Sequence, residues 1–292
     1  MRADVAGLLA PAAVARKTRT WRRFERHGLA LSGLCLIVLL IAIAILAPRL
    51  AMHDPTVQDL GHILSAPSVR HPMGTDDLGR DVLSRVLLGA RVSLAVAFSA
   101  VAILIFVGTV VGVIAGYYRS LDGWLMRVVD VLMSVPNVFL ILVVVGLLGP
   151  GLWTSMGVIG LTAWMGTARL VRGQFLSLRD REFVEAARAI GAGGRRIIWS
   201  YLMPNTRSLI TVQATLYISY AVITESLLSY LGLGTQPPTP SWGNILSSGR
   251  SFMREAWWMT VFPGCAIFVT VLAFNFFGDG LRDVLDPRGQ TS

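Results

Sequence analysis

Two carboxylates stand among apolar residues, where a charged group can carry protons or line a transport pathway. Asp130 precedes Ser134 by four residues, and Glu225 interrupts an apolar run near its end. A carboxylate in such a run is costly unless it faces a partner, water or the interior of a helix bundle. Asp130 and Ser134 could form a proton relay, although a solvated or capping carboxylate is the more common arrangement. Glu225, with Gln213 on a similar helix face, could line a translocation pathway or form a hydrogen-bonded tie between helices, and the tie is preferred.

Metal chemistry finds little support in the other polar residues. Three carboxylates lie close together in the sequence, but Arg80 stands among them, which disfavours a cation site at Asp76, Asp77 and Asp81. The histidines show no ligand spacing and are scattered at positions 27, 53, 62 and 71. Cys35 and Cys265 both lie inside apolar runs, which is typical of small core residues. No metal site is expected.

The sequence also gives little support for nucleotide binding by this chain. The chain has a single lysine, Lys17, and this lysine lacks the preceding glycines of a P-loop. If ATP drives a process in which this chain takes part, another chain must bind it. No cofactor is therefore expected in this chain.

The composition indicates a membrane protein. Hydrophobic residues make up 54% of the 292 residues and charged residues only 15%, whereas about a quarter of a soluble domain is charged. The net charge is +9, but the arginines flank apolar runs and form no separate basic domain, which argues against nucleic acid as a partner. Runs long enough to cross about 30 Å of hydrocarbon as helices lie at 29–47, 92–118, 128–149, 152–171, 208–231 and 257–278. The predicted fold class is an all-α polytopic membrane protein with six transmembrane helices.

Several features refine this six-helix prediction. The basic arm before residue 29 is too long for a cleaved signal peptide, so the first run is expected to be a retained span. The segment 71–94 alternates charged and apolar residues and predicts an amphipathic interfacial helix. Residues 119–127 are expected to form a short turn, and Pro136 and Pro263 to kink their helices. A stripe of glycines for close helix packing is predicted at Gly108, Gly112 and Gly116. A belt of tryptophans at the membrane interface is predicted from Trp242, Trp257 and Trp258.

The distribution of basic residues predicts the orientation. With the amino terminus inside, the inner segments hold 19 Arg and Lys residues and the outer segments hold 7. Basic residues favour the cytoplasmic side of a membrane. Both termini and the segment 181–205 are therefore expected in the cytoplasm of a multi-pass protein of the plasma or inner membrane.

The segment 181–205 is the most basic and least membrane-like part of the second half of the chain. Phe183, Ala187 and Ile190 fall on one apolar face of a short predicted helix. Gly191 then interrupts this helix in a left-handed turn. A second helix is expected over 195–201, with a new boundary at Pro204.

The spacing Glu185-Ala186-Ala187, Gly191, Tyr201 and Met203-Pro204 resembles the EAA loop of ABC importer permeases, the coupling helix that seats in a groove of a cytoplasmic ATPase. The resemblance assigns ATPase coupling to Glu185, Ala186, Ala187, Arg188, Gly191, Pro204 and Asn205. Three other segments resemble the C-type subunit of dipeptide and oligopeptide importers. They are GTDDLGRDVLSRVLLGARVSL at 74–94, the core PPTPSWG of the loop 232–256, and the tail motif at 278–288.

This resemblance implies a type I ABC importer permease of the peptide/nickel class. It implies a cytoplasmic arm (1–28), a first helix (29–47), an extracytoplasmic loop with an amphipathic segment (48–90), a five-helix core (91–279) and a cytoplasmic tail (280–292). The implied partners are a B-type permease subunit, two ATPase subunits or domains that hold ATP and Mg²⁺, membrane lipid, and an extracytoplasmic peptide-binding protein facing Pro237, Pro238 and Trp242. The chain itself would catalyse nothing.

Two alternative functions stay open. Related permeases carry nickel chelates or glutathione, so the cargo could be one of these instead of a peptide. A secondary transporter coupled to protons through Asp130 or Glu225 is the alternative from another class. The apparent absence of paired ionisable residues on neighbouring spans, and of an internal repeat, counts against it.

Overall fold

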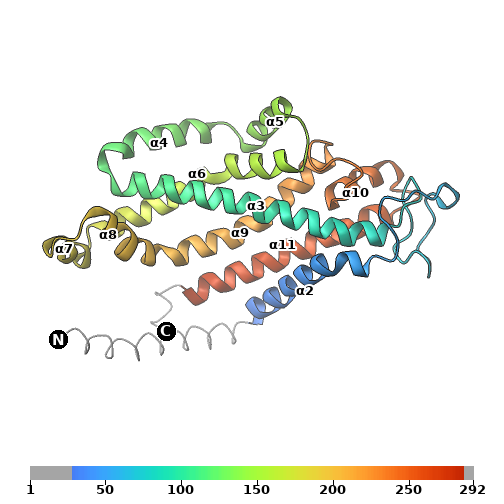
Figure 1. Ribbon diagram of the computed structural model, residues 1–292, viewed down its shortest axis with the longest axis horizontal. Coiled ribbons are helices and arrows are strands. Elements are labelled where there is room, and N and C mark those ends of the chain that lie inside the picture. The colour runs from blue at the N-terminus through green and yellow to red at the C-terminus, as the bar shows by residue number, and fades with distance from the viewer. Residues whose placement is uncertain (1–27, 286–292) are drawn as a thin grey trace.

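The computed structural model describes residues 28–285, which form a bundle of helices without a β-strand in that range (Figure 1). The helices are α2 (Gly28–Leu50), α3 (Val82–Tyr117), α4 (Arg119–Ser134), α5 (Asn137–Leu148), α6 (Leu152–Arg179), α7 (Glu182–Ala189), α8 (Gly194–Ile197), α9 (Met203–Tyr230), α10 (Trp242–Gly249) and α11 (Trp258–Leu285). Shorter turns of helix are η1 (Leu60–His62), η2 (Ile198–Leu202) and η3 (Arg250–Phe252). The basic arm and the last residues of the tail motif, Asp286, Pro287 and Arg288, lie outside the described residues.

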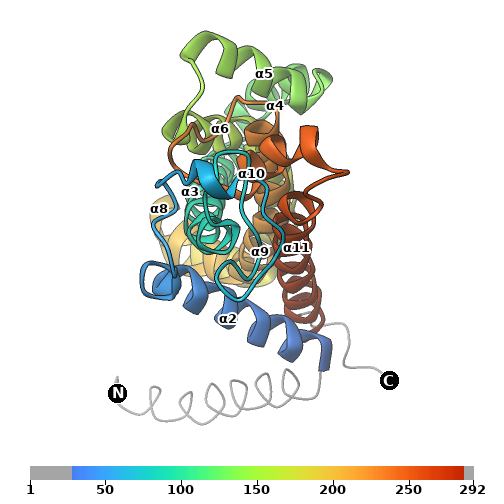
Figure 2. The same ribbon diagram turned by 90° about the vertical axis from the view of Figure 1, so that its right-hand side faces the viewer.

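The long helices run along the long axis of the molecule, so the bundle has two distinct ends. Helices α7 and α8 lie at one end, called here the α7 end, and α10 and the 51–81 loop lie at the other, called the loop end (Figure 1). Figure 2 shows α2 on one side of the bundle and α4 and α5 on the opposite side. The central position therefore falls to α3, α6 and α9.

Small residues permit a close and extensive contact between α3 and α6. A Cβ atom added at Gly112 would lie 2.6 Å from the carbonyl oxygen of Ala168, and one at Gly116 would lie 2.5 Å from the Cβ of Phe175. Gly108 is as close to Thr167. The predicted glycine stripe is thus confirmed, since only glycine lets the two backbones approach this closely.

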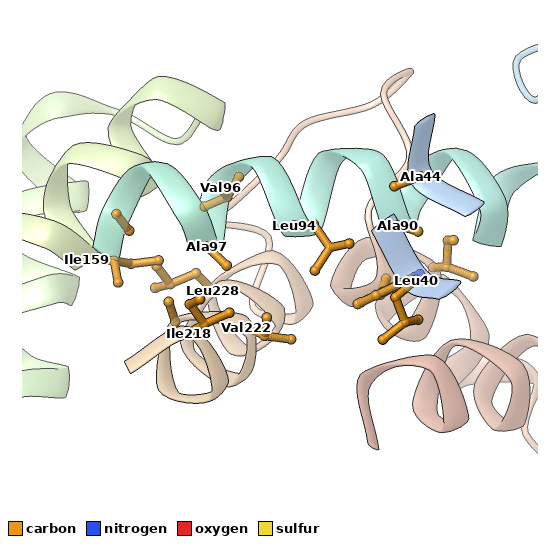
Figure 3. Packing of buried hydrophobic residues seen from close by; sticks show 14 of the residues in the cluster. Leu40, Ala44, Ala90, Leu94, Val96, Ala97, Ile159, Ile218, Val222 and Leu228 are labelled. Carbon is orange, nitrogen blue, oxygen red and sulfur yellow. The ribbon is translucent and has the colours of Figure 1, made fainter. Parts of the chain in front are cut away.

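The hydrophobic core joins α2, α3, α6, α9 and α11. Leu94 and Ala97 of α3 lie among buried residues of neighbouring helices, including Leu40, Ile159 and Val222 (Figure 3). Gly33 of α2 lies against the backbone of Phe277 and Ala273, which brings α2 onto α11. A smaller cluster at the α7 end contains Phe175, Val184 and Leu202.

The structure differs from the turn and the third span that were predicted over residues 119–149. Residues 119–127 are not a turn but the start of α4, which buries Met126 and Val129. Helix α4 is followed by a bend of 87° before α5. Pro136 lies at this bend and holds Val135 in an extended conformation, which helices avoid. The predicted kink at Pro136 is confirmed as a complete break.

The number of membrane spans remains a prediction. Within residues 28–285, the helices α2, α3 and α11 are long and apolar enough to cross a membrane, and the bent pair α4–α5 would add a fourth. Helices α6 and α9 have 28 residues each, about 42 Å at 1.5 Å per residue. They carry more polar side chains than α2 because they lie inside the bundle.

The segment 71–94 does not form a separate interfacial helix. Residues 71–81 form an irregular loop, and α3 starts at Val82 and continues without interruption to Tyr117. Asp81 is the N-cap, and its side chain accepts a hydrogen bond from the Ser84 backbone N–H. Most of the charged residues that suggested an amphipathic helix are paired instead, Asp76 with Arg80 and Arg85, and Asp81 with His71. Arg85 and Arg91 lie in α3.

Candidate functional site

Helix α7 is anchored to the bundle by a small apolar face. Val184 is buried in a cluster with Phe175 of α6 and Leu202 of η2, and Ala187 on the same side of α7 is buried as well. The predicted face of Phe183, Ala187 and Ile190 is therefore wrong except for Ala187, because Ile190 is 76% exposed and Phe183 40%. The i, i+3 pair of Val184 and Ala187 turns toward the bundle instead.

Gly191 ends α7 in a left-handed turn, as the sequence predicts. Its φ is +80°, and its backbone N–H donates to the carbonyl of Arg188 at 2.9 Å. The N–H of Ala192 donates to the carbonyl of Ala187 at 3.0 Å. These two hydrogen bonds form a Schellman motif, whose left-handed position favours glycine. A Cβ at Gly191 would meet nothing within 4 Å, so backbone conformation and not space requires this glycine.

The second half of the loop is helical without a break. Helix α8 continues through the π-helical turn η2 into α9. Pro204 lies in the first turn of α9, where a missing N–H is tolerated, so it does not separate two elements. Asn205 donates a side-chain hydrogen bond to the carbonyl of Tyr201 at 2.6 Å. Both Pro204 and Asn205 are exposed.

The outward side of this segment is a mixed apolar and charged surface at the α7 end. We call it the α7 surface, and it comprises the exposed residues Phe183, Glu185, Ala186, Arg188, Ile190 and Trp199. Large exposed apolar residues rimmed by charge mark protein interaction sites. Of the residues predicted to couple to an ATPase, only Ala187 is buried; Gly191, Pro204 and Asn205 are exposed but lie outside the residues of this surface.

Glu225 is fully buried and joins several elements at the loop end. Its carboxylate accepts hydrogen bonds from Ser93 of α3 at 2.9 Å and from Ser229 of α9 at 2.7 Å. The Ser93 hydroxyl also accepts from the backbone N–H of Trp242, and the Ser229 hydroxyl from that of Thr235. These are the hydrogen bonds of a tie between helices. Gln213 is half-buried and twelve residues away along α9, about 18 Å, so it belongs to no common site with Glu225.

Ionisable residues are paired between α4 and α6, contrary to the sequence-based expectation. Asp130 pairs with Arg169, and Asp122 binds Arg172 through both carboxylate oxygens. Sequence spacing could not reveal these pairs because the partners are 39 and 50 residues apart. Asp130 is exposed, and Ser134 donates to the carbonyl of Val131 instead of to Asp130.

Two of the three predicted belt tryptophans are buried. Trp242 is 1% exposed, and its indole N–H donates to the carbonyl of Val86 at 3.0 Å. Trp258 donates to the carbonyl of Thr75 at 2.9 Å, while Trp257 is half-exposed. Trp242 therefore cannot face a binding protein as predicted. Pro237 and Pro238 are exposed at the loop end.

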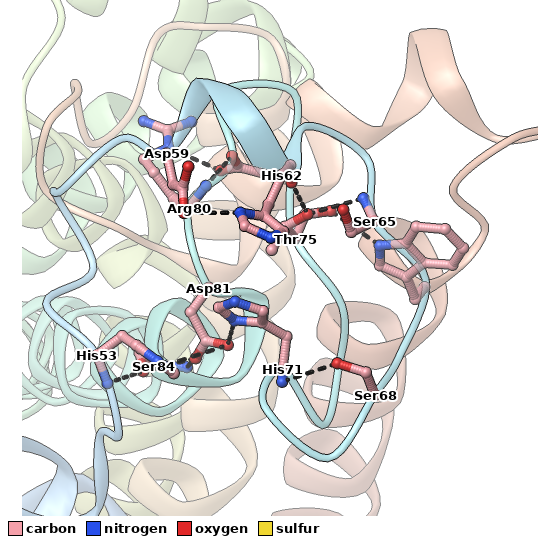
Figure 4. A network of polar contacts seen from close by, with 12 residues as sticks. His53, Asp59, His62, Ser65, Ser68, His71, Thr75, Arg80, Asp81 and Ser84 are labelled. Atoms are coloured by element: carbon pink, nitrogen blue, oxygen red, sulfur yellow. Dashed lines mark hydrogen bonds and ion pairs between the residues drawn. The ribbon is translucent and has the colours of Figure 1, made fainter.

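The 51–81 loop is held by its own carboxylates (Figure 4). Asp76 accepts hydrogen bonds from the backbone N–H and the guanidinium of Arg80, and Arg85 lies 3.4 Å away. Gly74 and Gly79 both have φ of +73°. Burial and the neighbouring Asp76 raise the pKa of the Asp77 carboxyl. Residues 74–81 of the segment that resembles other permeases thus lie in a loop held by its own polar contacts, and the rest of that segment belongs to α3.

Comparison with solved structures shows the class of fold. A chain of the MetNI methionine ABC transporter, from a structure of its inward-facing conformations, matches with a TM-score of 0.58. The match covers 70% of this chain and 97% of the other, at 20% identity. The bundle therefore has the type I permease fold of ABC importers.

Comparison with families is more specific. The chain belongs to the family of binding-protein-dependent transport system inner membrane components, whose model matches residues 108–290. A second model, the N-terminal TM domain of oligopeptide transport permease C, matches residues 18–67. Together with the apolar helices, this makes the chain a multi-pass inner-membrane protein.

The chain is also similar to curated proteins over most of its length. It is 41% identical to the dipeptide transport system permease protein DppC of Alkalihalophilus pseudofirmus, covering 94% of this chain and 91% of that protein. It is 39% identical to the di/tripeptide transport system permease protein DppC of Pseudomonas aeruginosa, over 92% and 91%. The glutathione transport system permease protein GsiD of Escherichia coli is 44% identical, over 92% and 89%.

Proposed function

We propose that the chain is the C-type permease subunit of an ATP-driven importer that carries di- or oligopeptides into the cytoplasm. The observation that carries this proposal is the α7 surface. A helix of eight residues is marginal in water by itself, yet α7 is fixed to the bundle on one side and presents Glu185 and two large apolar residues on the other. Such a surface suits a partner protein that binds α7 and moves it.

The partner is an ATPase, and the mounting of α7 suggests how its motion reaches the membrane. Val184 belongs to the cluster that contains Phe175 of α6 and Leu202 of η2, which continues into α9. A displacement of α7 would thus be transmitted to two central helices. ATP binding would draw α7 along with the closing ATPases and open the bundle outward, and hydrolysis would reset it.

The remaining partners follow from the exposed surfaces. A B-type permease subunit and lipid would cover apolar side chains on α5, such as Phe139, Val143 and Leu147. An extracytoplasmic binding protein would meet the loop end near Pro237 and Pro238. Two ATPase subunits or domains would hold ATP and Mg²⁺, since this chain has no P-loop. The chain would therefore be a non-catalytic subunit.

The cargo is inferred from relatives. Two of them are named for dipeptide or di/tripeptide transport, and a glutathione permease is at least as similar. Because glutathione is itself a tripeptide, it is the second candidate, ahead of nickel chelates. Competition of unlabelled dipeptide, tripeptide and glutathione against labelled dipeptide uptake would separate these cargoes.

The coupling role is tested by Glu185→Lys and Gly191→Val in the assembled transporter. Reversing the charge of a desolvated interface carboxylate typically costs about 2–5 kcal/mol. Valine at Gly191 is strained by at least about 1–2 kcal/mol in a left-handed conformation. We expect both variants to lose ATPase co-purification and peptide uptake while the bundle stays folded and binding-protein docking survives.

Arg282→Ala is the control for these variants, because Arg282 is exposed near the end of α11 and outside the 181–205 segment. It should keep both ATPase association and uptake. Full association and uptake in both loop variants would refute the assignment of residues 182–205 to ATPase coupling.

A further inference from the structure

Two histidines that are distant in the sequence meet at one carboxylate in the 51–81 loop. His71 Nδ1 lies 2.9 Å from Asp81 Oδ1, and His53 Nδ1 lies 3.8 Å from the same oxygen. The two imidazole rings are 4.7 Å apart between centroids. Figure 4 shows His53 and His71 on either side of Asp81. Sequence spacing does not indicate this cluster, because His53 follows α2 while Asp81 is the N-cap of α3.

Hydrogen bonding leaves this cluster incompletely satisfied. The Nδ1 atom of His53, which lies nearest Asp81, is buried without a hydrogen-bond partner. The other ring nitrogen of His71, Nε2, is also buried without one, while its Nδ1 is paired with Asp81. His71 as a residue is only 7% exposed. A buried polar atom without a partner costs free energy and points to an interaction that the protein atoms do not supply.

The donor atoms match the dimensions of a zinc site. One donor atom from each of the three residues lies within 4.8 Å of the others. Zinc binds histidine nitrogen and carboxylate oxygen at about 2.0–2.2 Å in a tetrahedron, which places two ligands roughly 3.4 Å apart. The observed distances to Asp81 Oδ1 lie on either side of this value, so small side-chain shifts would bring both histidines to an ion.

The surroundings supply what a metal site needs beyond its ligands. The second oxygen of Asp81 accepts hydrogen bonds from the N–H and hydroxyl of Ser84 at 2.8 and 2.6 Å. Such contacts orient a ligating carboxylate. The guanidinium of Arg80 is engaged by Asp76 and Asp77. The side chain of His53 is 35% exposed, which leaves a path to solvent.

We infer that His53, His71 and Asp81 form a binding site for a divalent transition-metal ion of the zinc type. Two imidazoles and one carboxylate favour zinc over calcium or magnesium, which prefer oxygen ligands. A bound ion would join the residue that follows α2 to the N-cap of α3. It would thereby fix the 51–81 loop, and this role is independent of the cargo and of the ATPase.

The test uses the full-length chain, purified without a histidine tag in lipid nanodiscs and stripped of metal with a chelator. Titration calorimetry with Zn²⁺ should give one saturable site, and Zn²⁺ should raise the thermal midpoint. Co²⁺ in place of Zn²⁺ should give visible d–d absorption bands of a low-symmetry site. His53→Gln should weaken Zn²⁺ binding at least tenfold while the circular dichroism spectrum is retained.

His62→Gln is the matched control. His62 lies in the same loop, but its Nδ1 atom is 2.9 Å from Asp59, and its ring centroid is 6.4 Å from that of His71. This variant should bind Zn²⁺ like the unaltered chain. The proposal is overturned if no saturable Zn²⁺ binding is found, or if His53→Gln binds as tightly as His62→Gln. Asp81→Asn provides a second ligand variant, and unchanged binding there would also contradict the site.

Discussion

Glu225 illustrates at the scale of a residue how one buried carboxylate organises its surroundings. It accepts hydrogen bonds from serines of two helices, and each serine in turn accepts a backbone N–H from the loop or from α10. Without the Glu225 carboxylate, the hydroxyls of Ser93 and Ser229 would each lose one hydrogen bond in an apolar interior. These hydrogen bonds account for a buried carboxylate at position 225 without any role in proton transfer.

We predict that Glu225→Leu is destabilised far more than Glu225→Gln. Leucine has the right size but accepts no hydrogen bond, and each buried group left unsatisfied costs about 1–3 kcal/mol. Glutamine keeps an acceptor oxygen, so most of the tie should survive, and so should transport. Thermal unfolding of the purified chain measures this difference.

Gln213→Leu on the same helix serves as the control and should unfold close to the unaltered chain. Equal destabilisation by leucine and glutamine at position 225 would count against the tie. Complete loss of transport in a stably folded Glu225→Gln protein would instead favour a proton-carrying role.

At the scale of elements, the contact between α3 and α6 holds the centre of the bundle. Glycines face backbone or Cβ atoms along this contact, on α3 at 108, 112 and 116, and on α6 at Gly160. In a membrane, van der Waals packing replaces much of the hydrophobic effect as the force between helices. Loss of close approach should therefore matter more here than the loss of one side-chain contact.

We predict that Gly112→Ala destabilises the bundle by about 1–3 kcal/mol, the usual cost of overpacking. Its Cβ would lie 2.6 Å from a backbone oxygen of α6, which cannot move without the whole helix. Gly173→Ala on α6 is the matched control, since its Cβ would meet nothing within 4 Å. That control should be neutral or stabilised, because alanine favours helix. The thermal midpoint and the resistance to unfolding in detergent measure the stability of both variants. Equal midpoints would contradict the prediction.

At the scale of the whole molecule, the two ends differ in chemistry. The α7 end carries Arg181, Arg188, Arg195 and Arg196 on exposed positions, whereas the charged residues of the 51–81 loop are largely paired with one another. Basic residues favour the cytoplasmic side. The α7 end is therefore proposed to face the cytoplasm and the loop end the outside.

This orientation predicts opposite labelling of Ser177→Cys and Thr239→Cys by a membrane-impermeant maleimide. Both positions are exposed, one on α6 beside α7 and the other in the loop end. Cys35 and Cys265 are exposed as well and must first be replaced by serine. Thr239→Cys should react in intact cells, and Ser177→Cys only after permeabilisation. Labelling of both from outside would refute the orientation.

Local features of this protein were determined by the sequence alone. The break at Pro136, the left-handed turn at Gly191 and the glycine stripe of α3 all follow from backbone rules that involve a residue and its near neighbours. The long apolar runs likewise predicted helices, because their length and composition suit a membrane. The family also followed, since motif spacing is a property of the chain itself.

Long-range contacts were decided only by the tertiary structure. Periodicity could not show which side of the eight-residue α7 meets the bundle, because Phe183 and Ile190 are as apolar as Val184. Trp242 suited a surface belt by type, yet it is buried because α10 folds back onto Val86. The Asp122–Arg172 pair and the cluster of His53, His71 and Asp81 join residues of different elements. Spacing along a chain carries no information about such contacts until the helices are packed, since packing alone sets which side chains meet.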